Sequence, residues 1–144
     1  MKKLILAFLF LTGCAHGPTL SYRIGEGFSE TQIRAIHTAA GKWNAIANES
    51  HQISIEDCAS NVIEFRSSLL NGADGGWGKL SGDIHILAGV DDARFEHLIL
   101  HEMGHGLGLC LEEHLPAPAV MDEHASVLEF TEKDLEACRH VGAC

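Results

Sequence analysis

The sequence has few basic residues and no apolar run long enough to cross a membrane. Its 144 residues include 10 Lys and Arg against 20 Asp and Glu, which gives a net charge of -10. Proteins that bind nucleic acids use cations to neutralise phosphates, so this balance argues against a nucleic-acid partner. A membrane-spanning helix needs about 20 consecutive apolar residues, and no segment reaches that length. The chain length suits one domain, which we expect to act as a monomer.

The N-terminus is typical of an export signal. Lys2 and Lys3 precede an apolar run at 4–11, and Cys14 follows shortly after it. The ending Leu-Thr-Gly-Cys resembles the lipobox of bacterial lipoproteins, in which the cysteine is acylated and becomes the mature N-terminus. An ordinary signal peptide cut nearby, with Cys14 left as a free thiol, is the alternative.

The lipobox resemblance implies how the chain is divided and where it acts. Residues 1–13 would form the lipoprotein signal peptide, residues 14–19 a tether, and residues 20–144 the folded domain. The protein would then be exported and anchored by lipid to the bacterial membrane. No aspartate directly follows Cys14, which favours the outer membrane or the cell surface.

Four cysteines belong to the domain once Cys14 is set aside. They lack the close C-x-x-C spacing of thiolate zinc sites, which argues against a role as metal ligands. Small exported domains commonly contain disulfides, so we expect two of them. Three pairings are open, and the sequence does not choose among them, for Cys58, Cys110, Cys138 and Cys144.

Apolar residues alternate in some segments and recur at helical spacing in others. The alternation predicts strands at 19–24, 51–55, 62–65 and 83–87. Capping patterns predict helices that begin after Ser29, at Asp91, and at Thr131 with Asp134 three residues later. Residues 71–78 contain four glycines and are predicted to be a loop that holds no regular element.

The most specific chemical pattern is the pentad His101-Glu102-Met103-Gly104-His105. Histidines four apart on a helix project from one face, so two imidazoles can share one zinc ion. A glutamate after the first histidine can take a proton from a water molecule that the metal activates. The pentad therefore predicts His101 and His105 as metal ligands and Glu102 as the general base. A chain with 10 histidines can also contain this spacing by chance.

Three further features support the metal site. Gly108 lies three residues after His105, where a glycine lets the helix stop and the chain turn sharply toward a third ligand. Met121 lies downstream at the distance where metzincins place the methionine of their Met-turn. Export is the third feature, because exported proteins meet zinc and peptide substrates together.

These residues together resemble the catalytic domain of the matrixins, within the metzincin zinc metallopeptidases. The resemblance covers roughly residues 20–140. Tyr22-Arg23-Ile24 resembles the start of such domains, and Gly82-Asp83-Ile84-His85 resembles the edge strand that lines their substrate cleft. The resemblance implies an α+β, metzincin-like zincin fold with a twisted mixed β-sheet and about three α-helices. It also implies a peptide or protein substrate bound in extended form against the edge strand.

The sequence departs from the family at the third zinc ligand. The resemblance implies a histidine six residues after His105, and that position is Leu111. We expect His114 to replace it, with a loop after Gly108 that is three residues longer. A carboxylate serves as third ligand in other zinc hydrolases. The alternatives are Glu112, Glu113 and His124.

Other candidate residues have simpler interpretations. His97 precedes His101 by one turn and is expected to be solvated or a neighbour of the site. His85 matches a structural-zinc position of the family, but its upstream partner pattern is missing, so we expect no second zinc. Asp74 is a weak candidate for Ca²⁺ binding, since ordinary turn chemistry explains it equally well.

The sequence thus predicts a zinc-dependent endopeptidase with one catalytic Zn²⁺. Glu102 would act first as base toward the attacking water and then as acid toward the leaving amine. The only tyrosine, Tyr22, lies near the N-terminus, so stabilisation of the oxyanion would depend on the metal and backbone amides. One alternative is a lipid-anchored, zinc-binding surface protein that does not catalyse, which Leu111 favours. Another is a hydrolase of cell-wall peptides.

Overall fold

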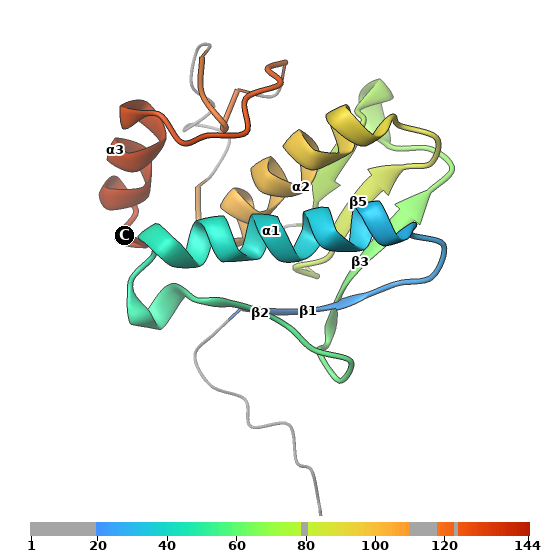
Figure 1. Cartoon of the computed structure of the whole chain (residues 1–144), viewed down its shortest axis with the longest axis horizontal. Helices are drawn as coiled ribbons and strands as arrows, with labels where there is room; N and C mark the ends of the chain where they lie inside the picture. The colour runs from blue at the N-terminus through green and yellow to red at the C-terminus, as the bar shows by residue number, and fades with distance from the viewer. Residues whose placement is uncertain (1–19, 79–80, 110–117, 123) are drawn as a thin grey trace, which may run out of the picture.

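A computed structural model of the chain describes residues 20–78, 81–109, 118–122 and 124–144. These residues form a five-stranded mixed sheet and three α-helices, and Figure 1 shows their arrangement. The predicted α+β fold with a mixed sheet and three helices is confirmed. In chain order the elements are β1 (Leu20–Ile24), α1 (Glu30–Ile46), β2 (Ile53–Ile55), β3 (Asn61–Arg66), β4 (Gly75–Trp77), β5 (Ile84–Leu87), α2 (Asp92–Gly106) and α3 (Glu132–His140).

The strand order in the sheet is β2-β1-β3-β5-β4. The first four of these strands pair in parallel, and β4 pairs with β5 antiparallel at the edge. Two predictions were therefore wrong. The glycine-rich segment 71–78 contains a strand, because backbone hydrogen bonds to β5 need no side chains. The edge strand is consequently β4, and Ile84–Leu87 lies one position inside the sheet.

Alternate residues of the strands face the helices and form the core. Tyr22, Ile63, Ile84 and Ile86 are fully buried there. The opposite face of the sheet carries polar side chains, such as the cross-strand pair Glu64 and His85. This alternation is what a sheet covered on one side requires, and it places α1 and α2 together on the apolar face.

Helix α1 begins and packs as its sequence predicts. Ser29 caps the helix with Gln32 in a reciprocal capping box, which satisfies backbone N–H groups at the first turn. Trp43 is fully buried on its inner face, and its indole N–H donates to the carbonyl of Leu100 on α2 over 2.8 Å. The two helices are therefore joined by a buried hydrogen bond as well as by apolar contact.

Helix α3 lies beside the C-terminal end of α1 (Figure 1). A disulfide joins Cys138 to Cys144 and closes the end of the chain onto α3. Cys58 is disulfide-bonded as well, whereas Cys110 and Cys14 lie outside the described residues. Within the part of the chain that the structure describes, no helix is long and apolar enough to cross a membrane.

Candidate metal centre

Helix α2 is the most deeply buried element of the fold. The Asp91 side chain caps it by accepting the backbone N–H of Arg94 over 2.9 Å. The helix ends at Gly106, and Gly108 then adopts a φ of 102°. This left-handed conformation is open to glycine at low cost, so the predicted sharp turn after the helix is confirmed. The turn directs the carbonyl of Leu109 back toward the helix.

The two pentad histidines lie together on one side of α2. Their ring centroids are 4.8 Å apart, and the ring planes meet at 87°. Only 3% of His101 and 8% of His105 is exposed. The helical spacing thus brings two imidazoles to one buried place, as the sequence predicts.

Each of these imidazoles is oriented by a backbone carbonyl. His101 Nδ1 lies 3.0 Å from the Val120 oxygen, and His105 Nδ1 lies 2.5 Å from the Leu109 oxygen. A carbonyl oxygen can only accept, so each Nδ1 carries a proton, and in the neutral form of such a ring Nε2 is the nitrogen that can bind a metal. Metal-binding histidines are commonly held in this way. The donor set therefore fits a zinc ion bound through two Nε2 atoms.

Met121 packs against the middle of the pentad. The turn that contains it is closed by the Asp122 N–H, which donates to the Ala119 oxygen over 3.2 Å. Met121 is fully buried, and a Cβ added at Gly104 would come within 2.6 Å of its sulfur. Gly104 therefore has a packing role that the sequence pattern alone does not reveal, since only glycine lets the methionine approach this closely.

Asp134 on α3 supports the same turn. Its carboxylate is fully buried and accepts the backbone N–H groups of Val120 at 3.1 Å and Met121 at 3.0 Å. It also accepts the N–H and the hydroxyl of Thr131. The capping pattern of Thr131 and Asp134 indicates the second pair of bonds. The bonds from Asp134 to the methionine turn join two different segments of the chain, and no local signal predicts them.

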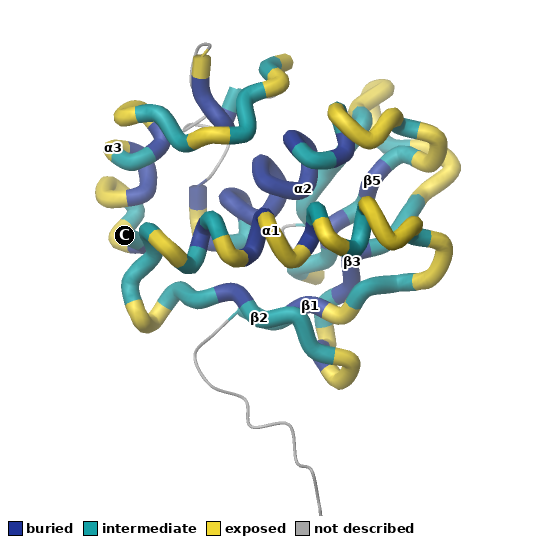
Figure 2. Tube along the Cα trace, viewed as in Figure 1, coloured by how far each residue is buried: buried dark blue, intermediate teal, exposed yellow. Residues whose placement is uncertain are grey.

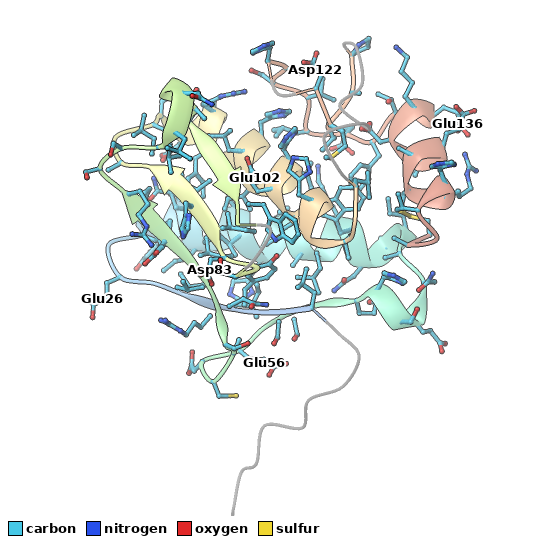
Figure 3. All side chains as sticks on the ribbon, turned by 180° about the vertical axis from the view of Figure 1, so that it is seen from behind. Glu26, Glu56, Asp83, Glu102, Asp122 and Glu136 are labelled. Atoms are coloured by element: carbon cyan, nitrogen blue, oxygen red, sulfur yellow. A yellow bond between two sulfur atoms is a disulfide. The ribbon has the colours of Figure 1, made fainter. Side chains whose placement is uncertain are left out.

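Glu102 faces the edge strand β4. Only 4% of the residue is exposed, and Figure 3 labels it on α2, beside that strand. A Cβ added at Gly75 would come within 2.9 Å of its Oε1 atom. Strand β4 can therefore lie this close to the carboxylate because residue 75 has no side chain, a role that the prediction of a featureless loop missed.

Tyr22 and Trp77 converge one turn further along the same face of α2. A Cβ added at Gly106 would lie 2.5 Å from Tyr22 Oη and 3.7 Å from Trp77 Nε1. Both atoms are buried, and neither has a hydrogen-bond partner of good geometry among the described residues. Burial raises the pKa of Tyr22 well above its usual range. The neighbouring indole N–H of Trp77 lowers the pKa in part, and the charge of Glu102 raises it further. Tyr22 lies near the N-terminus in sequence, yet its hydroxyl packs against Gly106 at the end of α2.

The expectation that His97 is solvated was wrong. The side chain is fully buried, and its ring nitrogens lie 2.9 Å from the Val127 oxygen and 3.1 Å from the Asp122 oxygen. Its ring also neighbours that of His101, with centroids 5.9 Å apart. His97 therefore attaches the segment after Met121 to α2. It is a neighbour of the site, which was the alternative prediction.

The remaining candidate ligands are only partly described. His114, Glu112 and Glu113 lie outside the described residues, and His124 is exposed. Within the described ranges, no three His, Cys, Asp or Glu side chains gather closely enough to hold a metal ion. Asp74, the calcium candidate, forms an ion pair with Arg94 at 3.4 Å. Calcium binding and the third zinc ligand stay predictions.

The fold and the site together define an α+β protein in which an H-E-x-x-H helix crosses the apolar face of a mixed sheet. Myroilysin is similar to this chain with a TM-score of 0.48 and 16% identity, covering 67% of this chain and 50% of that chain. High choriolytic enzyme 1, a hatching enzyme zinc-protease from Oryzias latipes (Medaka fish), is similar with a TM-score of 0.42 and 18% identity, covering 60% and 42%. This chain thus spans half or less of their length. No family model matches the chain, and no curated protein does.

Proposed function

We propose that this protein is a zinc-dependent endopeptidase in which His101, His105 and His114 hold the metal and Glu102 is the general base. One observation carries the proposal. Both described histidines direct Nδ1 to a backbone carbonyl while their ring centroids lie 4.8 Å apart, so Nε2 is the nitrogen that each neutral ring would offer to zinc. His114 supplies the third ligand in this proposal, from outside the described residues.

The residues of α2 supply positioning and proton transfer. Zinc, when bound, supplies the Lewis acidity that lowers the pKa of water and polarises a peptide carbonyl. Glu102 accepts the proton of the attacking water at its carboxylate and delivers it to the leaving amine. The close packing of β4 over this carboxylate restricts water around it. The backbone carbonyls of Val120 and Leu109 fix the orientation of the two imidazoles.

Strand β4 offers a place for the substrate. It pairs with β5 on one side only, so among the described strands its other edge is open. An extended peptide can add to such an edge through backbone hydrogen bonds, which tolerates many sequences. The substrate class is therefore peptide or protein, aligned beside Glu102. We further propose that Cys14 anchors the domain by lipid outside the cell, where such substrates are present.

The decisive test measures zinc content and casein hydrolysis in the purified protein. Glu102→Gln should retain zinc and lower kcat by about 10²–10⁴-fold, because it removes the proton carrier. Glu96→Gln is the matched control on the same helix, outside the proposed site, and should leave kcat unchanged. Equal activity in wild type and Glu102→Gln would refute the proposed base.

The third ligand and the substrate class need separate measurements. His114→Ala should lose zinc, whereas retained zinc would assign the position to Glu112 or Glu113. Isolated peptidoglycan tested beside casein separates the protease from a hydrolase of cell-wall peptides. Stoichiometric zinc without hydrolysis of either substrate would indicate the binding protein instead.

A further inference from the structure

The peptide group between Val120 and Met121 is held on both of its sides. Its carbonyl, on Val120, accepts from His101 Nδ1 at 3.0 Å. Its N–H, on Met121, donates to Asp134 Oδ1 at 3.0 Å. A peptide group is planar and rigid, so a rotation that breaks one bond also misdirects the other. The carboxylate of Asp134 is thereby coupled to the orientation of the His101 ring.

The two oxygens of Asp134 have different tasks. Oδ2 accepts from Val120 N, Thr131 N and the Thr131 hydroxyl. Oδ1 accepts from the Met121 N–H. The first oxygen therefore serves the helix start and the turn together, whereas the second acts on the peptide group that orients His101.

Helix α3 is held at its other end by the C-terminal disulfide. Cys138 lies four residues after Asp134, on the same buried face of α3, and is fully buried. It is bonded to Cys144, and the loop between them attaches to the end of α1. Asn48 donates its backbone N–H to the Ala143 oxygen at 2.9 Å and its side-chain amide to the Gly142 oxygen at 2.8 Å. The disulfide-closed loop thus joins α3 to α1.

We propose that Asp134 is a positioning residue for the metal ligand His101, which it acts on through the Val120–Met121 peptide group, and that the Cys138–Cys144 disulfide holds α3 where Asp134 can do so. The proposal rests on the proposed zinc site. It makes the affinity for zinc depend on a helix that contributes no metal ligand. Loss of the disulfide in a reducing environment would consequently weaken metal binding without any change in the ligands.

Asp134→Asn separates positioning from simple stability. With its oxygen in the place of Oδ2, the asparagine keeps three of the four bonds and turns its NH₂ group against the Met121 N–H. The matched control is Thr131→Val, which removes a hydroxyl bond to the same carboxylate and leaves both bonds to the turn intact. Both variants weaken α3, but only Asp134→Asn disturbs the peptide group that holds His101.

The first readout is the zinc dissociation constant, measured by competition with a chelator. Loss of an outer partner of a metal ligand commonly lowers affinity by about 10–100-fold, and we expect a loss near the lower figure for Asp134→Asn. Thr131→Val should bind zinc as tightly as wild type. If both variants lose zinc affinity, each in proportion to the decrease in its melting temperature, Asp134 has no positioning role.

The second readout does not need zinc. The His101 Nδ1 proton, observed by NMR in the metal-free protein, should shift and exchange faster in Asp134→Asn and stay unchanged in Thr131→Val. The His105 Nδ1 proton is an internal control, because its partner is Leu109 and not the turn. If wild type binds no zinc, the proposed function fails, and this resonance alone decides the positioning role.

Cys144→Ser tests the disulfide. The variant removes only this bridge and keeps Cys138 in place. Because α3 would then be held less firmly, Cys144→Ser should bind zinc more weakly than wild type, as Asp134→Asn does. The double variant Asp134→Asn/Cys144→Ser should be no weaker than Asp134→Asn, since both act through one contact. Wild-type affinity in Cys144→Ser, or additive losses in the double variant, would contradict the link between disulfide and metal site.

Discussion

Helices α1 and α2 pack against each other and against the same face of the sheet, yet they differ in what they bury. Of the 17 residues of α1, four are buried, all of them apolar. Of the 15 residues of α2, ten are buried, and these include His97, His101, Glu102 and His105. Figure 2 shows buried colour along most of α2 and along one side only of α1.

The difference shows what each helix contributes. A polar group can be buried at tolerable cost only where the fold supplies a hydrogen-bond partner. The three histidines of α2 each meet a backbone carbonyl from outside the helix. Helix α1 needs no such partners and fixes α2 through Trp43. We infer that α1 is scaffold and that α2 is the functional element.

The largest expected effect concerns the strand above α2. Gly75→Ala places a methyl group against the Glu102 carboxylate, because the added Cβ would lie 2.9 Å from Oε1. Displacement of a catalytic group by about 1 Å can cost about 10²-fold in rate, and we expect kcat for casein to fall by that order. Gly76→Ala is the matched control, since its Cβ would meet nothing within 4 Å. Equal activity in the two variants would show that β4 does not constrain Glu102.

The next largest effect is on stability, and it compares a glycine of α2 with a glycine of α1. Gly104→Ala on α2 would bring a Cβ to 2.6 Å from the Met121 sulfur and 2.9 Å from Trp43. Overpacking of this kind costs about 1–3 kcal/mol. Gly41→Ala on α1 meets nothing within 4 Å and should stabilise by about 0.5–1 kcal/mol. Urea denaturation measures both changes, and a shift of the same sign in both would remove the distinction between the helices.

The smallest effect concerns Tyr22, which contacts the end of α2. Burial raises its pKa well above the usual range, and the charge of Glu102 adds to this. The folded state then keeps the phenol proton to higher pH than the unfolded chain does. This contribution to stability is complete below the unfolded pKa of about 10 and is lost as pH rises toward the folded pKa.

An absorbance titration measures the Tyr22 prediction directly, because the chain contains one tyrosine. Tyrosinate should form only together with unfolding, as followed by circular dichroism on the same sample. Ionisation of the folded protein near the ordinary pKa would show that the phenol is accessible to solvent and does not pack against Gly106.

Local patterns predicted most of the fold. The capping box of Ser29 and Gln32, the apolar spacing around Trp43 and the pentad on α2 all depend on neighbours in sequence, and the structure contains each of them. Gly108 was predicted for the same reason, since a chain that leaves a helix sharply needs a left-handed residue.

Features that depend on distant contacts were not predicted. Strand β4 exists because β5 provides hydrogen bonds to glycines that have little strand propensity of their own. Asp134 reaches the turn at Met121 only after α3 has packed. His97 is buried because two carbonyls from the segment after Met121 meet its ring. A single sequence contains no local signal for any of these contacts.

We propose that α2 binds a metal through Nε2 of His101 and of His105, and imidazole ¹⁵N spectra recorded with and without zinc can show this. We expect Nδ1-protonated rings for His101 and His105 in the metal-free protein. One equivalent of zinc should then shift their Nε2 resonances and leave the Nδ1 resonances nearly in place. If zinc shifts neither ring, or shifts exposed histidines such as His124 instead, α2 does not hold the metal.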